Sequence, residues 1–256
     1  MALVEDRSLD IRKAKSIAET HCHTVASSHA YSTILENIAY AKKNRMCAVA
    51  ITEHCPQMPD GPHIWFFENL LSVNRMIDDT IMLRGAEADI ISYEGGLDLP
   101  DRILEQLDWV IASFHFPLGI KVSVDEYTKA YIEVAKNKNV HVIGHCGTEA
   151  FRFDYERGIK AFKEYNKIVE INAHSFTVRK GAAINCVEIA KLCKKYEVPV
   201  VVSADAHLAV EIGCVQPSLD LLADIDFPEH LILNIDKDRF FDSLERYCGL
   251  KADDLK

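Results

Sequence analysis

The chain has 256 residues, 48% of them hydrophobic, and a formal net charge of −10. This acidic balance argues against a general affinity for nucleic acid, which needs a basic surface, and no apolar run approaches the ~20 residues of a membrane helix. The first fifteen residues lack the apolar core of a secretion signal, so we expect a cytoplasmic protein. The length suits one domain. We predict an N-terminal extension over residues 1–15 and one folded domain over 16–256.

Short, nearly continuous apolar runs predict the strands of a buried parallel sheet, in which both faces of each strand are covered. Counted from Ser16, there are seven of them, and each leads into a histidine or a carboxylate. The runs and the side chains that follow them are 16–18 with His21 and His23, 48–52 with His54, 81–86 with Glu87, 109–114 with His115, 140–144 with His145, 168–172 with His174, and 198–203 with Asp205 and His207.

Between these runs the apolar residues recur at helical spacing, with charged residues on the opposite face. The predicted helices cover residues 33–45, 124–137, 155–165, 179–196 and 237–248. Alternating strands and helices, with reactive side chains at the C-terminal ends of the strands, predict an α/β barrel whose site lies at its mouth. A further apolar run at residues 231–234 leaves open whether there is an eighth strand or an outer strand.

The histidines are the clearest functional signal, because seven of the eleven lie where a metal ligand is expected. His21 and His23 are two residues apart, so a strand would place both rings on one face, where they can bind one ion. His29 follows a turn of small residues and can face a different ion. Imidazole favours zinc, and mixed nitrogen and carboxylate sites also accept manganese or iron, so the sequence leaves the ion open.

Eight cysteines could suggest disulfides or a zinc finger instead, but the sequence contains no C-x-x-C pair. Most of them lie in apolar settings, which is typical of reduced cysteines in a core. Cys22, between His21 and His23, should point to the other face of its strand. We therefore interpret all eight cysteines as structural.

The order of the ligand-type residues resembles that of the PHP (polymerase and histidinol phosphatase) family. The pattern is a His-x-His pair, a Thr-Glu-His triplet, a glutamate, a histidine, a Gly-His pair and an Asp-x-His pair, and it spans roughly residues 16–248. Residues 23–33, 61–63, 175–181 and 226–228 look like the YcdX-type subgroup in particular. The resemblance implies a distorted (β/α)7 barrel with a trinuclear metal site, and a metal-dependent phosphoesterase.

The resemblance also assigns three divalent ions to residues of this chain. The first ion would be bound by His21, His23, Glu87 and Asp205, the second by Glu87 as a bridge with His115 and His145, and the third by His29, His54 and His207. Two positions depart from the family pattern, since Glu19 and Glu53 stand where the family usually has aspartate. An added methylene shifts a hydrogen bond behind the ligands, which affects metal preference and rate more than metal binding.

The activity that this resemblance implies is hydrolysis of a small phosphomonoester by a metal-bound hydroxide, which attacks phosphorus in line. No Gly-x-Ser-x-Gly motif or phosphatase cysteine motif provides a nucleophile of the protein's own. The residues that we expect to be catalytic are Glu87, His115, Asp205 and His207. The expected substrate contacts are Arg179, Lys180, His174 and His63.

Several alternatives stay open. The same metal site could act on histidinol phosphate or on the 3′ end of a nucleic acid strand, and without catalysis it would be a metal-binding module. Arg179 and Lys180 could simply begin a solvated helix, and His63 could belong to a plain surface loop. Apolar helix faces could be core or the interface of a homo-oligomer, as at Leu219, Leu221 and Leu222.

Overall fold

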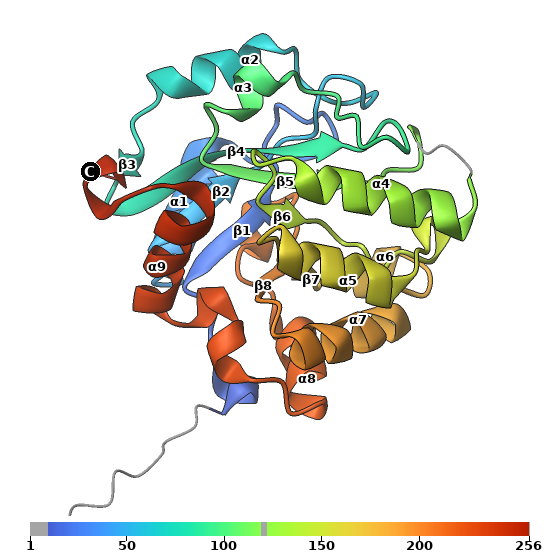
Figure 1. Ribbon diagram of the computed structural model, residues 1–256. Helices are drawn as coiled ribbons and strands as arrows, with labels where there is room; N and C mark the ends of the chain where they lie inside the picture. Colours follow the sequence, from blue (N-terminus) through green and yellow to red (C-terminus); the bar gives the residue numbers. More distant parts are fainter. Residues whose placement is uncertain (1–9, 119–121, 256) are drawn as a thin grey trace, which may run out of the picture.

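The computed structural model describes residues 10–118 and 122–255 and shows one sheet rolled into a barrel among helices (Figure 1). The strands are β1 (Ala18–Cys22), β2 (Ala48–Ile51), β3 (Met76–Ile77), β4 (Thr80–Asp89), β5 (Trp109–Ser113), β6 (Val142–Ile143), β7 (Ile168–Asn172) and β8 (Val200–Ser203). The α-helices are α1 (Ile34–Lys43), α2 (Trp65–Asn69), α3 (Asp101–Leu104), α4 (Val124–Lys136), α5 (Tyr155–Glu164), α6 (Ser175–Val178), α7 (Ala182–Tyr196), α8 (Gln216–Asp224) and α9 (Lys237–Cys248).

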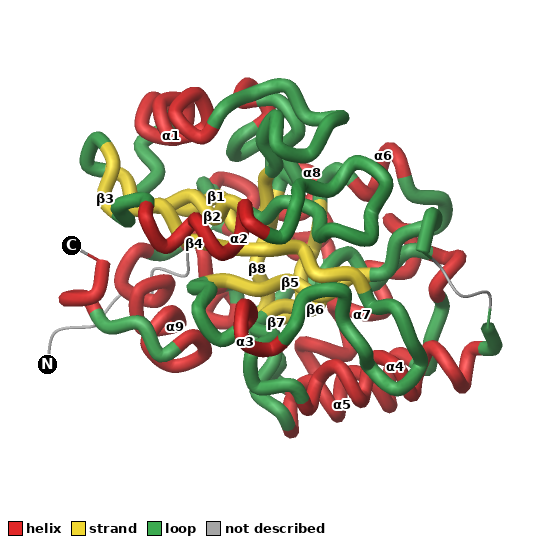
Figure 2. The backbone as a smooth tube through the Cα atoms, turned by 90° about the horizontal axis from the view of Figure 1, so that it is seen from above, coloured by secondary structure: helices red, strands yellow, loops and turns green. Residues whose placement is uncertain are grey.

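Seven of the strands are parallel and follow one another in chain order, from β1 and β2 through β4 to β8, while β3 pairs antiparallel with β4. The barrel closes where β1 meets the chain beyond β8. There the N–H of Ala206 donates to the His21 carbonyl at 3.2 Å, and the N–H of His23 donates to the Ala206 carbonyl at 2.8 Å. Figure 2 shows the strands gathered at the centre with helices around them. The predicted α/β barrel of seven parallel strands is confirmed.

The interior of the barrel is apolar at one end and polar at the other. Inward-facing residues alternate with outward-facing ones along each strand. At the start of the strands the inward residues are apolar, as for Leu83 of β4 and Trp109 of β5, and Phe240 and Leu244 of α9 pack against this group. Further along each strand, toward its C-terminal end, the inward side chains become polar. Glu87 of β4, four residues after Leu83, is one example. The site therefore lies at the C-terminal ends of the strands.

The outward-facing strand residues pack under the helices and form the larger part of the core. Helices α4, α5, α7 and α8 follow one another along one side of the molecule (Figure 1). Leu219, Leu221 and Leu222 of α8 are buried in this layer within a single chain. They therefore belong to the core and give no evidence for a homo-oligomer interface.

Two predicted elements differ in the structure. The helix expected over residues 179–196 begins only at Ala182, because Gly181 adopts a left-handed φ of 77° and separates α7 from the short α6. The run at residues 231–234 forms no strand. Its residues fall in two 3-10 turns, Glu229–Leu231 and Leu233–Ile235, and among the described residues a single bridge, between Ile232 and Val200, pairs the run with the sheet.

The predicted extension over residues 1–15 is described only in part. Residues 1–9 lie outside the described residues. Ile11–Lys13 form a 3-10 turn against α8, and Ile11 is buried. The boundary at residue 15 stays a prediction. None of the helices described is both long and apolar enough to cross a membrane.

His141, just before β6, is expected to make the fold sensitive to acid. It is buried, and its Nδ1 accepts the N–H of Val110 at 2.9 Å. Burial, and then the charge of Lys167, lower the pKa of His141 from 6.5 to about 3. Between these two pH values the unfolded chain binds the proton and the folded chain does not, so the free energy of unfolding falls by about 1.4 kcal/mol per pH unit as the pH drops.

The variant His141→Asn keeps an acceptor for Val110 but cannot titrate. Between pH 6.5 and pH 5 we expect it to lose about 2 kcal/mol less of its free energy of unfolding than the wild type loses. Urea unfolding at the two pH values measures the difference. An equal loss in both proteins would show that His141 is not held neutral.

Candidate metal centre

A β-bulge in β1 aims the first two histidines into the barrel. Between Glu19 and Cys22, β1 has one residue more than the stretch of β2 with which it pairs. A bulge of this kind re-aims the side chains that follow it. His21 and His23 are fully buried and point toward Glu87, whereas Cys22 lies in the outer layer of the core. The prediction that both rings share one face is confirmed.

Glu87, on β4, lies at the centre of a cluster of histidine rings. Its Oε1 is 2.7 Å from Nε2 of His145 and 3.3 Å from Nε2 of His115. Its Oε2 is 3.0 Å from Nδ1 of His54 and 3.3 Å from Nε2 of His21. A carboxylate whose two oxygens face two different groups of imidazoles is placed to bridge two ions.

Asp205, in the turn after β8, lies beside the histidines of β1. Its Oδ1 is 3.2 Å from Nε2 of His23 and 3.6 Å from Nε2 of His21. Its Oδ2 accepts hydrogen bonds from Asn172 at 3.2 Å and from Arg179 at 3.1 Å. One carboxylate oxygen is thus anchored, while the other faces the imidazoles.

A more open group of histidines lies at the rim of the barrel. Nε2 of His207 is 2.7 Å from Nε2 of His29, and the rings of His29 and His54 lie 5.2 Å apart. Asp60, which the sequence analysis did not predict, is 2.5 Å from Nδ1 of His29. The structure therefore brings all nine predicted ligand residues together at one barrel mouth, namely His21, His23, His29, His54, Glu87, His115, His145, Asp205 and His207.

Buried polar atoms without a hydrogen-bond partner among the described residues face this cluster. They are Nε2 of His21 and of His115, both ring nitrogens of His23, Nδ1 of His54 and Oε2 of Glu87. Each such atom costs about 1–3 kcal/mol if it stays unpaired, so their gathering in one place indicates a ligand. Four overlapping groups of three side chains have donor atoms within 4.8 Å of one another. Imidazole nitrogens and carboxylate oxygens at this spacing fit divalent ions.

The charged groups of the cluster stabilise one another against burial. Burial alone would raise the pKa of Glu87, yet it lies well below its usual range because His115 and His21 are beside it. The pKa of Asp205 is also well below its usual range, because His21 and His23 outweigh the effect of burial. Burial lowers the pKa of His23 far below that of a free imidazole. Both carboxylates are therefore ionised and His23 is neutral, as metal ligands need to be. Burial opposes the charging of His21 and His115, but the carboxylates beside them raise the pKa of both rings.

Buried carboxylates behind the cluster hold the histidine rings in place. Glu170 of β7 is 2.6 Å from Nδ1 of His21, and Asp89 of β4 is 2.5 Å from Nδ1 of His115. Contacts of this kind fix the orientation of a ligating ring and raise its basicity. Neither carboxylate is predicted above, although each leaves a signal in the sequence. Glu170 interrupts an apolar strand, and Asp89 follows Glu87 by two residues and so shares its face.

The two glutamates that depart from the family pattern bind backbone and hydroxyl groups. Glu19 accepts the N–H of Ala204 at 3.1 Å and the N–H of Gly213 at 2.9 Å. Glu53 accepts the hydroxyl of Ser27 at 2.6 Å. Both side chains tie the loops at the barrel mouth to the strands. Their effect on metal preference stays a prediction.

The backbone at the site is strained in two places. Asp205 and His145 adopt positive φ angles of 50° and 22°, a conformation that costs about 1–3 kcal/mol in residues other than glycine. Gly144 permits a close approach just before His145. A Cβ at this position would lie 2.7 Å from the hydroxyl of Ser113, which donates to Glu87 at 2.6 Å. A side chain at residue 144 would therefore displace the support of Glu87.

A cavity of about 370 Å³ opens over the cluster, and its walls include Arg179 and His174. Nη1 of Arg179 donates to Asp205 at 3.1 Å and to the hydroxyl of Ser175 at 3.0 Å, which holds the guanidinium in the wall. The ring of His174 stacks on that of His207 with 5.8 Å between centroids. Two of the four predicted substrate contacts therefore lie beside the cluster.

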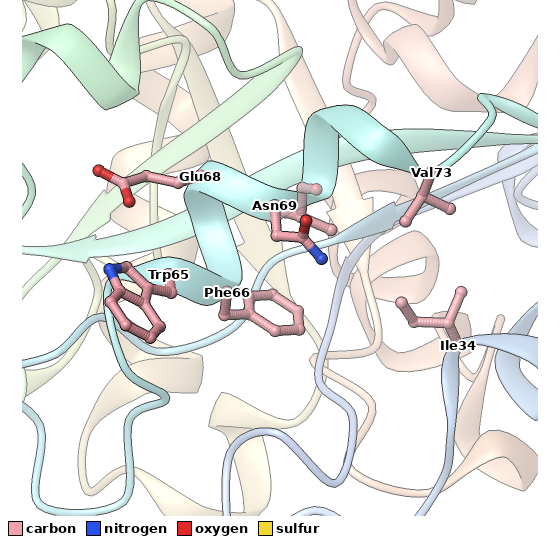
Figure 3. Close-up of a pocket in the computed structure, with 7 residues that line it drawn as sticks. Ile34, Trp65, Phe66, Glu68, Asn69 and Val73 are labelled. Atoms are coloured by element: carbon pink, nitrogen blue, oxygen red, sulfur yellow. The ribbon is translucent and has the colours of Figure 1, made fainter.

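The other two predicted substrate contacts, His63 and Lys180, do not line this cavity. Both are exposed, and the ring of His63 meets that of Trp65 edge-on at 5.0 Å. Figure 3 shows Trp65 and Phe66 beside a separate hollow, with Ile34 of α1 nearby. A role of His63 and Lys180 in substrate binding stays a prediction.

Two solved structures share this fold. Histidinol phosphate phosphatase from Lactococcus lactis, complexed with zinc, L-histidinol and phosphate, aligns with a TM-score of 0.56 and 15% identity, over 83% of this chain and 94% of that one. A chain of an archaeal ribonuclease P with mature tRNA aligns with a TM-score of 0.55 and 13% identity, over 90% of this chain and 89% of that one. At such low identity the likeness shows the fold alone.

No family model matches the sequence, but several known proteins are similar over most of their length. The chain is 42% identical over 226 residues to a probable phosphatase of Caldicellulosiruptor saccharolyticus, which covers 88% of this chain and 95% of the relative. It is 43% identical over 229 residues to a probable phosphatase of Caldanaerobacter subterraneus subsp. tengcongensis, with 89% and 90% covered. It is 41% identical over 238 residues to a probable phosphatase of Clostridium novyi, with 93% and 98% covered.

The barrel fold and the cluster of imidazoles and carboxylates at its mouth are features of a metal-binding hydrolase. The similar proteins define the class more closely. The chain belongs to this family of probable phosphatases, and it is an enzyme of the class that hydrolyses phosphoric esters.

Proposed function

We propose that this protein is a phosphatase of the PHP family that uses three divalent ions to hydrolyse a small phosphomonoester. The observation that supports this most is the convergence of seven histidines with Glu87 and Asp205 around buried donor atoms that lack partners. Zinc is the ion that we propose, with manganese or iron as alternatives, because most of the donors are imidazole nitrogens.

The proposed ligands follow the contacts of the two carboxylates. We assign the first ion to His21, His23, Glu87 and Asp205, the second to Glu87, His115 and His145, and the third to His29, His54 and His207. Asp60 would orient His29 from behind. The residues that we propose as catalytic are Glu87, His115, Asp205 and His207, because the last three line the cavity and Glu87 lies 3.3 Å from His115.

When bound, the ions would supply a hydroxide near neutral pH and neutralise the charge that develops on the phosphoryl oxygens. The protein's own residues position the rings and the substrate. Glu170 and Asp89 keep two rings in the orientation that a ligand needs. Arg179 lines the cavity, where its guanidinium can bind a phosphate in fork geometry. Met58 and Val178 give the cavity an apolar wall.

The choice of substrate can be tested with a panel of phosphate esters. The cavity of about 370 Å³ suits a small ester, and the net charge of −10 opposes binding of a nucleic acid strand. We expect the metal-loaded protein to release phosphate from an aryl phosphate and from histidinol phosphate. Release of nucleotides from the 3′ end of an oligonucleotide, with no turnover of small esters, would contradict the proposal.

Replacing Arg179 with alanine is expected to raise KM for a phosphomonoester by about tenfold or more, since a charge-assisted contact to phosphate contributes about 1.5–3 kcal/mol. Metal content should not change, because Asp205 keeps its hydrogen bond from Asn172. Steady-state kinetics and elemental analysis measure both quantities. The matched variant Arg157→Ala removes an exposed guanidinium of α5 and should alter KM by less than about twofold, because Arg157 does not line the cavity. An equal rise of KM in the two variants would contradict the proposed role of Arg179.

A further inference from the structure

A second cavity, of about 850 Å³, lies between α1 and α8 and shares no wall residue with the cavity over the metal centre. Its walls come from the chain before β1, from the end of α1, from the loop at residues 210–215 and from the start of α8. Lys15, Lys43 and Arg45 line it, and no aspartate or glutamate does so among the described residues. In a chain of net charge −10, three cations in one cavity create a local field of the opposite sign.

These three cations are available to a ligand. In the part of the chain that the structure describes, none of them has a carboxylate partner, and Lys43 lies over the ring of Tyr40 at 4.9 Å. Neighbouring cations behave differently. Arg12 and Lys13 are both paired with aspartates. Among the described residues, cations just outside the cavity therefore form ion pairs, whereas the three that line it do not.

Two carboxylates lie near the cavity but outside its lining. Glu19 and Glu211 are the acidic groups that act on the thiol of Cys214 in the cavity wall. Glu19 accepts the N–H of Gly213 at 2.9 Å, and Glu211 accepts the N–H of His207 at 2.8 Å. Both carboxylates are bound to backbone groups and neither lines the cavity, so the cations are the charged groups of its wall.

Helix α1 ends in a hydrogen-bonded motif that fixes the backbone position of Arg45. The N–H of Arg45 donates to the carbonyl of Lys42 and the N–H of Met46 donates to that of Ala41, each at 2.9 Å. This pair of hydrogen bonds is the Schellman motif, and Arg45 occupies its left-handed position with a φ of 61°. Glycine fits this position with the least strain. Arg45→Gly thus removes the guanidinium without harming the helix end.

We infer that this cavity binds a phosphorylated small molecule at a site separate from the metal centre. Lys15, Lys43 and Arg45 hold the phosphoryl group, since a guanidinium fork with two ammonium groups suits a phosphate dianion. The other walls include accessible apolar side chains, Ile17 and Val210 among them, and these accept the organic part of the ligand. The volume lies within the range of about 300–1,000 Å³ that is usual for small-molecule sites.

The test uses phenylphosphonate, which carries a phosphoryl group on an apolar ring and resists hydrolysis. Calorimetric titration of the full-length, metal-loaded protein should show two sites per chain. The triple variant Lys15→Gln, Lys43→Gln and Arg45→Gln should bind at the second site about tenfold or more weakly. Its turnover of an aryl phosphate should equal that of the wild type. A control triple variant, Lys191→Gln, Lys237→Gln and Lys251→Gln, changes the net charge equally and should keep both sites.

Two further variants separate this inference from the proposed function and from misfolding. Glu87→Gln should lose the site at the metal centre and keep the second one, so a single remaining site that Arg45 controls would still support the inference. Arg45→Gly should weaken the second site without lowering the melting temperature. Unchanged binding in Arg45→Gly and in the triple variant, or equal weakening in the control variant, would overturn the inference. Inorganic phosphate should bind more weakly than phenylphosphonate, and equal binding would contradict the apolar contact.

Discussion

Replacing Glu87 with glutamine is expected to remove most of the bound metal and to lower turnover of a phosphomonoester by about 10³-fold or more. The two oxygens of Glu87 face His145 and His115 on one side and His54 and His21 on the other. Glutamine has the same shape, but it lacks the charge and presents an amide N–H₂ group that cannot bind a cation. Elemental analysis of the purified protein and phosphate release measure the two losses.

The control for this variant is Glu164→Gln, which removes the same charge from an exposed position at the end of α5. It should keep full metal content and turnover. If Glu87→Gln retained the wild-type amount of metal, the bridging role of Glu87 would be wrong. A circular dichroism melt shows whether the barrel itself survives the change.

Glu170→Gln is expected to weaken metal binding and activity by about 10–100-fold, which is the usual effect of removing a partner behind a ligand. Glu170 is 2.6 Å from Nδ1 of His21, accepts the N–H of His145 at 2.7 Å and accepts the hydroxyl of Ser203 at 2.6 Å. Glutamine has only one oxygen with which to accept these buried donors, so at least one of them loses its partner. Titration with zinc, followed by turnover, measures the loss of affinity.

Excess zinc should restore much of the activity of Glu170→Gln but not that of Glu87→Gln. The difference follows because Glu170 orients a ring whose nitrogen is still present, whereas Glu87 is proposed as a ligand itself. If excess zinc restored neither variant, Glu170 would act on something other than ligand orientation. If both recovered equally, the assignment of Glu87 as a ligand would fail.

The sequence predicts the positions of the candidate ligands well, because they depend on a local rule. In a parallel barrel the C-terminal ends of all strands meet at one mouth, so a histidine or carboxylate at each strand end must converge with the others. The bulge in β1 is not visible in the sequence. It nonetheless preserves the expected result, since it re-aims His21 and His23 together.

Residues that act through distant contacts are harder to predict. Glu170 supports His21 across 149 residues of sequence, and Asp60 supports His29 across 31. No local pattern encodes such distances. The same limit applies to the predicted substrate contacts. Arg179 and His63 both lie in loops with typical features of a binding segment, and only the three-dimensional path of each loop shows that Arg179 reaches the cavity.

The start of α7 shows how backbone conformation can override periodicity. The helical spacing over residues 179–196 predicts one helix, yet the left-handed φ of Gly181 separates Arg179 from it. As a result Arg179 is held against Asp205 and does not begin a solvated helix. A glycine within a helical pattern is the only sequence signal of this break.

The most direct test of the proposed metal-dependent phosphatase is to strip the full-length protein with a chelator and to add zinc or manganese back. The release of phosphate from an aryl phosphate is followed together with the metal content. We expect no turnover without metal, and recovery as the metal content approaches three ions per chain. Full turnover in the stripped protein, or full metal occupancy without turnover of any phosphomonoester, would contradict the proposal.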